Sequence, residues 1–224
     1  MRLYPIKTPE LIQRMYPEFL WRFSSTKKEI YLTFDDGPTP NITEFVLEQL
    51  ALFNAKATFF CIGKNIVENS KILSKILKDG HTIGNHTNNH LKGWNTKRKT
   101  YLENVLIAQK YIDSHNSKAD NQQLKLFRPP YGKVRKMQVK DLQNYGYKIV
   151  MWDVLSGDWD NKISKERCLR NVIENTTSGS IVVFHDSKKA EANLKYVLPK
   201  LLAHFSKKGY IFKQYLFIYI TIII

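Results

Sequence analysis

Two adjacent carboxylates, Asp35 and Asp36, lie where an alternating apolar segment runs into a Gly-Pro turn. The apolar residues before them are Ile30, Leu32 and Phe34, a pattern typical of a strand. Because successive side chains on a strand point in opposite directions, the two acids can take different tasks. One can hold a metal while the other handles a proton. Taken alone, Asp-Asp-Gly-Pro is equally typical of a solvated turn.

Two histidines, His86 and His90, follow the Gly84-Asn85 turn and are four residues apart. On a helical turn this spacing puts both imidazoles on one face, within reach of one ion. Two His and one carboxylate leave coordination positions open for water and substrate, as in catalytic zinc sites. Read together with the Asp pair, the histidines predict a metal site.

A rigid segment, Arg128-Pro129-Pro130-Tyr131-Gly132, follows the apolar pair Leu126-Phe127. The two prolines have no N–H, so the amide of Tyr131 is the first free donor and is well placed to meet an oxyanion. The guanidinium of Arg128 has the geometry to hold a carboxylate. A rigid surface turn is the alternative interpretation.

Two more predicted strand ends carry polar or aromatic side chains. Asp158-Trp159-Asp160 follows one of them, and indoles beside acids suggest a sugar-binding wall, although ordinary packing is the commoner role of Trp. The other strand, Val182-Val183-Phe184, ends in His185-Asp186. His185 would supply a titratable group to the same rim, or it is an ordinary buried His.

Segments typical of strands alternate with segments typical of helices. The expected strands are 30–34, 57–62, 81–84, 124–127, 148–154, 180–184 and 210–213, and the expected helices are 41–54, 66–78, 97–114, 134–145, 165–174 and 194–207, with a polar loop at 116–123. Such alternation indicates parallel βαβ units in an α/β fold. About seven units, with their chemistry at the strand ends, favour a closed or nearly closed barrel with its active site at the C-terminal ends of the strands. An open doubly wound sheet is the alternative.

The chain is expected to form a single domain over 29–214, preceded by a lead-in segment at 1–28 and followed by an apolar tail at 215–224. In the lead-in, Thr8 is the expected cap and Pro9 the expected first position of a short helix with an apolar face at Leu11, Ile12 and Met15. The tail is about half the roughly 20 residues of a spanning helix, so no transmembrane helix is predicted.

The amino-acid composition limits the classes of protein to which this chain can belong. The 224 residues, 43% hydrophobic and 25% charged, are typical of a soluble globular protein. The net charge of +15 comes mostly from scattered Lys, which indicates a solvated surface or attraction to a polyanion such as an acidic cell-wall polymer. No basic stripe with interleaved aromatics is present, so no nucleic-acid partner is expected. The absence of a signal-peptide pattern predicts a cytoplasmic location, with association to the envelope as the alternative.

Together these motifs resemble the polysaccharide deacetylase family, the NodB-homology domain of carbohydrate esterase family 4. The five family motifs occur in family order between Thr33 and His185, and Thr-Phe-Asp-Asp-Gly-Pro and His-Thr-x-x-His are the most specific. The resemblance implies a distorted (β/α)7 barrel, TIM-barrel-like, that removes N-acetyl and sometimes O-acetyl groups with one divalent ion. The implied substrate is an acetylated glycan such as peptidoglycan or a chitin-like polymer of N-acetylglucosamine.

The resemblance also implies a role for each motif residue. Asp35 would be the general base, oriented by Arg128, and His185 the general acid, tuned by Asp158. Asp36, His86 and His90 would hold the metal, most simply Zn²⁺, with Co²⁺, Ni²⁺ or Mn²⁺ as alternatives. The Tyr131 amide would stabilise the oxyanion, and Trp159, Val183 and Pro130 would contact the substrate. Val183 stands where the family usually has Leu.

Three other functions compete with this interpretation. An enzyme of the same fold could act on small non-sugar amides or cyclic ureides. An inactive glycan-binding module would typically have lost the base or a metal ligand, whereas all are present here. A phosphatase with an Asp nucleophile would need Asp-x-Asp spacing and no His pair.

Overall fold

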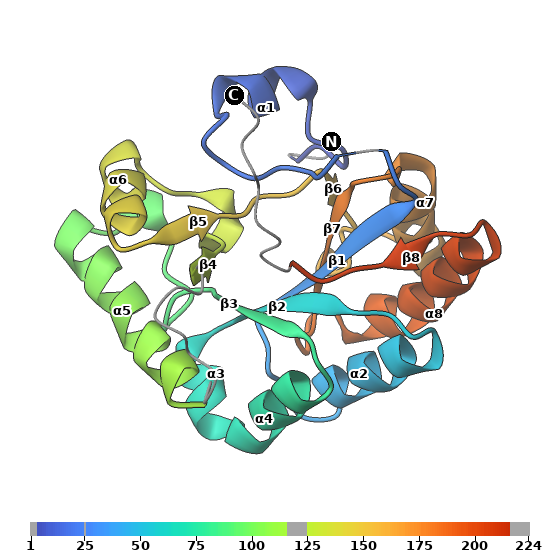
Figure 1. Cartoon of the computed structure of the whole chain (residues 1–224), viewed down its shortest axis with the longest axis horizontal. Coiled ribbons are helices and arrows are strands. Elements are labelled where there is room, and N and C mark those ends of the chain that lie inside the picture. Colours follow the sequence, from blue (N-terminus) through green and yellow to red (C-terminus); the bar gives the residue numbers. More distant parts are fainter. Residues whose placement is uncertain (1–3, 25, 116–124, 216–224) are drawn as a thin grey trace.

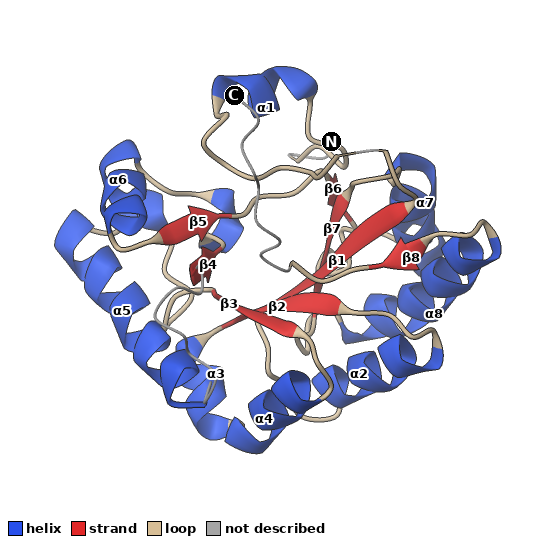
Figure 2. Ribbon diagram, viewed as in Figure 1, coloured by secondary structure: helices blue, strands red, loops and turns tan. Residues whose placement is uncertain are grey.

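A single curled parallel sheet forms the centre of the molecule, and helices surround it (Figure 1; Figure 2). The computed structural model describes residues 4–24, 26–115 and 125–215. The strands follow the order β5-β4-β3-β2-β1-β7-β6, and β8 pairs with β1 beside that path. Every pairing between these strands is parallel, so the predicted α/β fold with a distorted barrel is confirmed. The barrel is half-closed, because β5 and β6 at the two ends of the sheet do not pair.

The strands are short. They are β1 (Glu29–Asp35), β2 (Ala57–Cys61), β3 (Thr82–Asn85), β4 (Lys125–Phe127), β5 (Tyr147–Ile149), β6 (Val154–Leu155), β7 (Ile181–His185) and β8 (Ile211–Phe212). The helices are α1 (Glu10–Met15), α2 (Ile42–Leu52), α3 (Gly63–Glu68), α4 (Ser70–Lys78), α5 (Arg98–His115), α6 (Lys136–Asn144), α7 (Lys165–Asn175) and α8 (Glu191–Lys207). Two single 3₁₀ turns, η1 (Gly93–Asn95) and η2 (Pro130–Gly132), lie in loops after β3 and β4.

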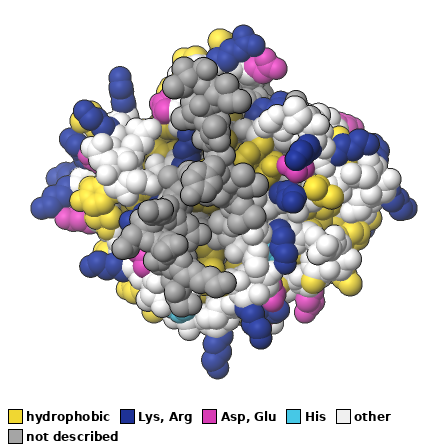
Figure 3. Space-filling model, viewed as in Figure 1, with side chains coloured by type: hydrophobic (Ala, Val, Ile, Leu, Met, Phe, Trp, Pro, Cys, Tyr) yellow, Lys and Arg dark blue, Asp and Glu magenta, His cyan; other side chains and the backbone are white. Residues whose placement is uncertain are grey.

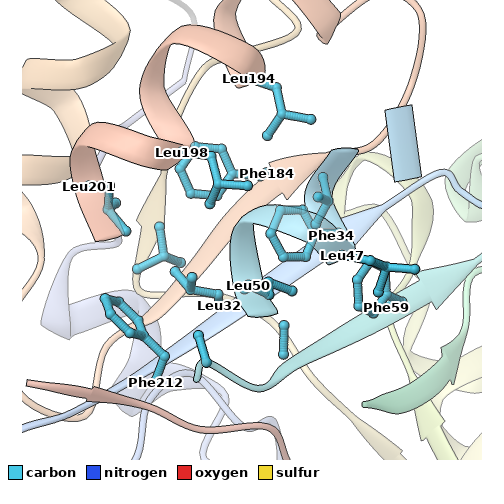
Figure 4. Close-up of a cluster of buried hydrophobic side chains, with 14 of the residues drawn as sticks. Leu32, Phe34, Leu47, Leu50, Phe59, Phe184, Leu194, Leu198, Leu201 and Phe212 are labelled. Atoms are coloured by element: carbon cyan, nitrogen blue, oxygen red, sulfur yellow. The ribbon is translucent and has the colours of Figure 1, made fainter. Parts of the chain in front are cut away.

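Side chains along β1 alternate between a face that packs into the apolar core and a face that lines the candidate site. Ile30, Leu32 and Phe34 are fully buried and join the main apolar cluster with residues of α2 and α8. Figure 4 shows Leu32 and Phe34 beside leucines of these two helices. Thr33 and Asp35 project from the other face, into the barrel, where Arg128 contacts both. The periodicity of two therefore delivers Asp35 to the barrel interior while its apolar neighbours anchor the strand.

The lead-in segment fills the gap between the two ends of the sheet. β5 and β6 are not neighbours in the sheet order, and the chain before β1 runs between them. Leu20 forms a parallel bridge with Val150, and Lys7 forms an antiparallel bridge with Val154. Described residues of this segment are thus packed into the barrel wall, and the predicted division into 1–28, 29–214 and 215–224 stays a prediction.

Two predicted elements are each interrupted. The strand expected at 148–154 is two strands, β5 and β6, because the carbonyls of Val150 and Met151 accept hydrogen bonds from Arg128. The helix expected at 66–78 is α3 and α4, which meet at Asn69. There φ is −132°, and the side-chain amide donates to the carbonyl of Pro38. The other predicted helices and strands within the described residues agree within three residues at each end.

The short helix of the lead-in differs from its prediction. Pro9 is its N-cap residue, and the hydroxyl of Thr8 donates to the carbonyl of Trp152 instead of capping. Leu11 and Met15, which belong to the expected apolar face, are 70% and 62% exposed. Six residues bury no side chain, so the bridges of the flanking chain hold this helix in place.

The C-terminal end is described as far as Tyr215. Its amide donates to the hydroxyl of Thr58, and its carbonyl accepts from the hydroxyl of Thr82. Its ring lies 5.5 Å from that of Phe23. The rest of the predicted tail and the predicted loop at 116–123 lie outside the described residues.

The net charge of +15 makes the protein basic. Lys and Arg side chains are spread around the periphery of the face in Figure 3. Among the described residues, no helix is both long and apolar enough to cross a bilayer.

Candidate active site

Three potential metal ligands converge at the C-terminal ends of β1 and β3. Oδ1 of Asp36 lies 3.3 Å from Nε2 of His90 and 3.7 Å from Nε2 of His86. The three ligand atoms all lie within 4.8 Å of one another. The backbone positions them through positive φ angles, 81° at Asp36 and 55° at His90. The structure therefore brings together the ligand set predicted from the sequence.

The protonation of these groups fits a cation. Nδ1 of His86 lies 2.7 Å from the carbonyl of Arg128, which can only accept, so Nδ1 carries the proton and Nε2 presents its lone pair. Burial lowers the pKa of His86, and burial together with His86 lowers the pKa of His90 to about 4. Burial disfavours charged Asp36, but the neighbouring imidazoles of His185, His86 and His90 lower its pKa. Two neutral imidazoles and one carboxylate are what a divalent ion requires.

A second observation supports the fit. Oδ1 of Asp36, the atom that faces both histidines, is buried and accepts no hydrogen bond from the described residues. A buried carboxylate oxygen without a donor is costly unless a cation is bound. The Asp-His-His cluster is thus consistent with a metal site.

Asp186 organises the turn that carries Asp36, a role that the sequence motifs did not indicate. Its Oδ1 accepts the amide of Gly37 at 3.0 Å, and its Oδ2 accepts the hydroxyl of Thr43 at 2.5 Å. A Cβ on Gly37 would lie 2.0 Å from Oδ2 of Asp186. On the other side, the side-chain amide of Asn65 donates to the carbonyl of Asp36 at 2.7 Å. These contacts fix the turn between β1 and α2, in which the Gly37-Pro38 bond is cis.

Asp35 lies beside the metal cluster and is paired with Arg128. Nη1 of Arg128 donates to Oδ1 of Asp35 and to the hydroxyl of Thr33, each at 2.7 Å. Arg128 is fully buried and Asp35 is 4% exposed. Such a pair needs nearly every donor satisfied, because an unpaired buried charge is costly.

The remaining contacts of Arg128 meet this need. Its Nε donates to the carbonyl of Val150 and its Nη2 to that of Met151, and its guanidinium lies 4.2 Å from the ring centroid of Phe60. Arg128 therefore sits rigidly inside the barrel and holds Asp35 in one orientation.

A titratable acid faces the cluster from the end of β7. Nδ1 of His185 donates to Oδ1 of Asp158 at 2.8 Å, and the amide of His185 donates to Oδ2 at 2.7 Å. Burial opposes the charged imidazole, but the carboxylate of Asp158 outweighs it and raises the pKa of His185 to about 9. His185 is consequently protonated at neutral pH, with its Nε2 free of Asp158.

Aromatic and apolar residues line the rim around these groups. The ring of Trp159 packs edge-on against His185 at 4.7 Å, and Val183 is buried on β7 two residues before it. Tyr131 has a φ of 60° and its ring lies 4.6 Å from that of His90. The turn hydrogen bonds at η2 use the amides of Gly132 and Lys133 and not that of Tyr131.

The lead-in segment also reaches this rim. The hydroxyl of Tyr4 donates to Oδ2 of Asp160 at 2.7 Å, and its ring lies 5.2 Å from that of Trp159. Nothing in the sequence around Tyr4 signals this contact, because it depends on the path of the chain across the gap between β5 and β6. Tyr4 therefore belongs to the wall of the site.

The half-closed parallel barrel carries at its strand ends an Asp-His-His cluster that is consistent with a metal site, beside a buried carboxylate and a protonated imidazole. The family model described as polysaccharide deacetylase matches residues 23–150. The chain belongs to this family, carbohydrate esterase family 4 with NodB homology. His185, Asp158 and Trp159 lie beyond the matched residues.

Individual relatives agree with the family. A peptidoglycan-N-acetylglucosamine deacetylase of Bacillus cereus is 36% identical over 194 residues, which cover 86% of this chain and 88% of that protein. A chitooligosaccharide deacetylase of Azorhizobium caulinodans is 30% identical over 197 residues, which cover 81% and 92%. The crystal structure of the Bc1960 peptidoglycan N-acetylglucosamine deacetylase superposes with a TM-score of 0.83 at 28% identity, covering 92% and 94%.

Proposed function

We propose that this enzyme, a polysaccharide deacetylase that hydrolyses C–N bonds, acts on N-acetylglucosamine residues of peptidoglycan. One observation supports this chemistry above all. The Asp36-His86-His90 cluster lies beside the carboxylate of Asp35, which is bound by Arg128, and faces the imidazolium of His185, which is bound by Asp158. The Bacillus cereus relative and the Bc1960 structure both carry the name of a peptidoglycan deacetylase. Chitin-type oligomers are the second candidate, supported by the Azorhizobium relative.

Zn²⁺ is the proposed ion, with Asp36, His86 and His90 as its ligands. Two imidazoles and one carboxylate are the ligand types that catalytic zinc sites use. Oδ1 of Asp36 lies 3.3 Å from Nε2 of His90 and 3.7 Å from Nε2 of His86, and all three ligand atoms lie within 4.8 Å of one another, so the three residues would hold one ion together. When bound, such an ion supplies Lewis-acid chemistry by polarising the acetyl carbonyl and lowering the pKa of water.

The protein side chains would move the protons. Asp35, oriented by Arg128, accepts a proton from the water that attacks the acetyl carbonyl. The amide of Tyr131 donates to the oxygen that becomes negatively charged. His185, held protonated by Asp158, gives its proton to the nitrogen as the C–N bond breaks, so the products are acetate and a free amine. Base and acid start in opposite protonation states, as the reaction requires.

The acetyl methyl group would enter the pocket walled by Trp159, Val183 and Pro130. The ring of Trp159 lies directly beside His185, so a methyl group against it would leave the scissile bond within reach of the acid. The side chain of Val183 is one carbon shorter than that of Leu, so this pocket would be slightly larger than one walled by Leu. A sugar O-acetyl group would fit the same pocket.

The proposal is tested by product analysis on glycans of equal length. The purified enzyme, with one equivalent of Zn²⁺, should release acetate and free amine from N-acetylglucosamine in peptidoglycan fragments more efficiently than from chitooligosaccharides. Small amides and cyclic ureides should give no turnover. Preferred turnover of a small amide would support the same-fold amidohydrolase instead, and binding of glycan without any turnover would support an inactive module.

A further inference from the structure

Two exposed aromatic rings and two lysines lie in the loops that follow β3 and β4, and one of these rings, that of Tyr131, contacts His90. We name the set Lys92, Trp94, Tyr131 and Lys133 the aromatic rim. Tyr131 is 61% exposed and Trp94 is 49% exposed, although large aromatic side chains are mostly buried in folded proteins. The ring of Tyr131 also contacts the ring of His90 at 4.6 Å. The aromatic rim is therefore continuous with the catalytic centre.

The rim is rigid, because the loops that carry it are bonded to each other. The amide of Gly93 donates to the carbonyl of Lys133 at 3.0 Å. The side-chain amide of Gln138 donates to the carbonyls of Gly93 and Thr96 at 3.0 Å and 3.1 Å. A Cβ at Gly93 would lie 2.5 Å from the carbonyl oxygen of Lys133, so this close approach requires glycine.

The indole of Trp94 is fixed in the same way. Its Nε1 donates to the carbonyl of Val134 at 3.1 Å, and its own carbonyl accepts from the guanidinium of Arg135. A ring that is exposed yet fixed at both its side chain and its backbone presents a ready platform. Binding to it costs little ordering of the side chain.

The charge at the rim is positive and uncompensated. Nζ of Lys92 lies 6.0 Å from the ring centroid of Tyr131, and Nζ of Lys133 lies 4.0 Å from that of Trp94. Neither lysine forms an ion pair with a described residue, whereas Lys75 and Lys195 each pair with a carboxylate one helical turn away. The segments 86–102 and 128–140, which carry the rim, contain no Asp or Glu.

The fixed aromatic rings and the two lysines together favour a sugar ligand that carries a negative charge. A fixed ring can stack on the apolar face of a sugar, and an ammonium group within reach of that ring attracts a carboxylate. A neutral chitin-type oligomer offers the sugar face without the charge. Peptidoglycan offers both, because its alternate sugars carry a lactyl ether whose carboxyl group is free or extended by a peptide.

We infer that the aromatic rim is a subsite for a carboxylate-bearing sugar next to the N-acetylglucosamine that loses its acetyl group, an inference that rests on the proposed function. Trp94 and Tyr131 supply the stacking surface, and Lys92 and Lys133 receive the carboxylate. The rim thereby gives the enzyme its preference for an acidic glycan over a neutral one.

The test compares a double variant, Lys92→Gln with Lys133→Gln, with the wild type on three oligomers of equal length. One is a chitooligosaccharide, the second alternates N-acetylglucosamine with N-acetylmuramic acid, and the third carries the peptide as well. The measured quantity is the ratio of kcat/KM on an acidic oligomer to kcat/KM on the neutral one. Two exposed charge contacts are worth roughly a threefold to tenfold change, so the ratio should fall by about that factor, mainly through KM.

Controls separate charge from stacking. A double variant of the same charge on the outer helices, Lys110→Gln with Lys207→Gln, should keep the wild-type ratio. Trp94→Ala should lower kcat/KM on all three oligomers and leave the ratio close to its wild-type value. The wild-type ratio should also fall as salt is added, because exposed charges are screened.

The outcomes distinguish this inference from the proposed function. A fall in the ratio for the peptide-free acidic oligomer identifies the lactyl carboxylate, and a fall confined to the peptide-bearing one identifies a peptide carboxylate. An unchanged ratio in an active double variant would overturn the subsite and leave the proposed function intact. If the wild type deacetylated none of the three oligomers, the subsite and the proposed function would both be overturned.

Discussion

The pairing of Asp158 with His185 gives a quantitative prediction for the pH profile. The pKa of His185 is raised from 6.5 to about 9, and the carboxylate of Asp158 is the main cause that acts in this direction. A difference of about 2.5 pKa units corresponds to roughly 3 kcal/mol of preference for the protonated imidazole. Asp158→Asn removes the charge while keeping the size of the side chain, so the pKa should fall toward its ordinary value.

The direction of the change in the pH profile follows from the role of His185 as the general acid. A raised pKa keeps His185 protonated at neutral and mildly alkaline pH, so activity is lost only as the pH rises through that pKa. In Asp158→Asn the loss should begin near the ordinary pKa of 6.5. At pH 8 the protonated fraction would fall from about 0.9 to about 0.03, a loss of roughly thirtyfold in kcat/KM.

The assay is the pH dependence of kcat/KM for acetate release, measured for the wild type and Asp158→Asn with one ion per chain. The bound ion opposes protonation of His185 in both proteins, so the shift between the two alkaline limbs is the relevant quantity. Circular dichroism and metal content serve as controls, because Asp158 also accepts the amide of His185. An alkaline limb at the same pH in both folded, metal-loaded proteins would refute the reasoning.

Three further predictions concern the metal cluster and the base. His86→Ala should lose metal and activity together, whereas the control His115→Ala, at the C-terminal end of α5, should keep both. A full metal equivalent in His86→Ala would show that the ligand set is wrong. Asp35→Asn should keep the metal while kcat falls by about 10² to 10⁴, the usual effect of removing a general base, and near-normal kcat would exclude Asp35 from that role. Gly37→Ala places a Cβ against Asp186, so the turn must shift at a cost of roughly 1–3 kcal/mol, read by thermal unfolding, and metal affinity should drop with it. Wild-type stability and affinity in Gly37→Ala would contradict this account of the turn.

The elements that position the site follow from the sequence to different degrees. The strand β1 is predictable, because the alternation of Ile30, Leu32 and Phe34 reflects one face against helices and the other toward the barrel interior. The two carboxylates that follow it are predictable as candidates by type and position. The Asp-His-His cluster then follows because the C-terminal ends of parallel strands meet at one edge.

The features that escaped prediction depend on contacts between distant parts of the chain. The strand expected at 148–154 is divided because Arg128 draws the carbonyls of Val150 and Met151 away from a strand ladder. The local apolar pattern at 148–154 gives no indication of the guanidinium of Arg128, which directly follows β4. Likewise, Asp186 follows a strand as an ordinary polar residue, and its bond to Gly37 becomes visible only when β1 and β7 are placed side by side.

The position of the lead-in segment also depends on contacts between distant parts of the chain. Its residues show no strand periodicity, so the sequence suggests a peripheral addition. The structure shows that Leu20 and Lys7 bridge Val150 and Val154 across the gap in the sheet. Backbone groups at the ends of an open sheet need partners, and any suitably placed stretch of chain can supply them.

The most direct test of the central claim is a titration of the metal-free enzyme with Zn²⁺ while acetate release from a peptidoglycan fragment is measured. If Asp36, His86 and His90 form a single catalytic metal site, acetate release should rise linearly with added ion and saturate at one ion per chain. The activity should disappear again on chelation. Full acetate release by the metal-free enzyme, or no acetate release at one equivalent, would contradict the claim.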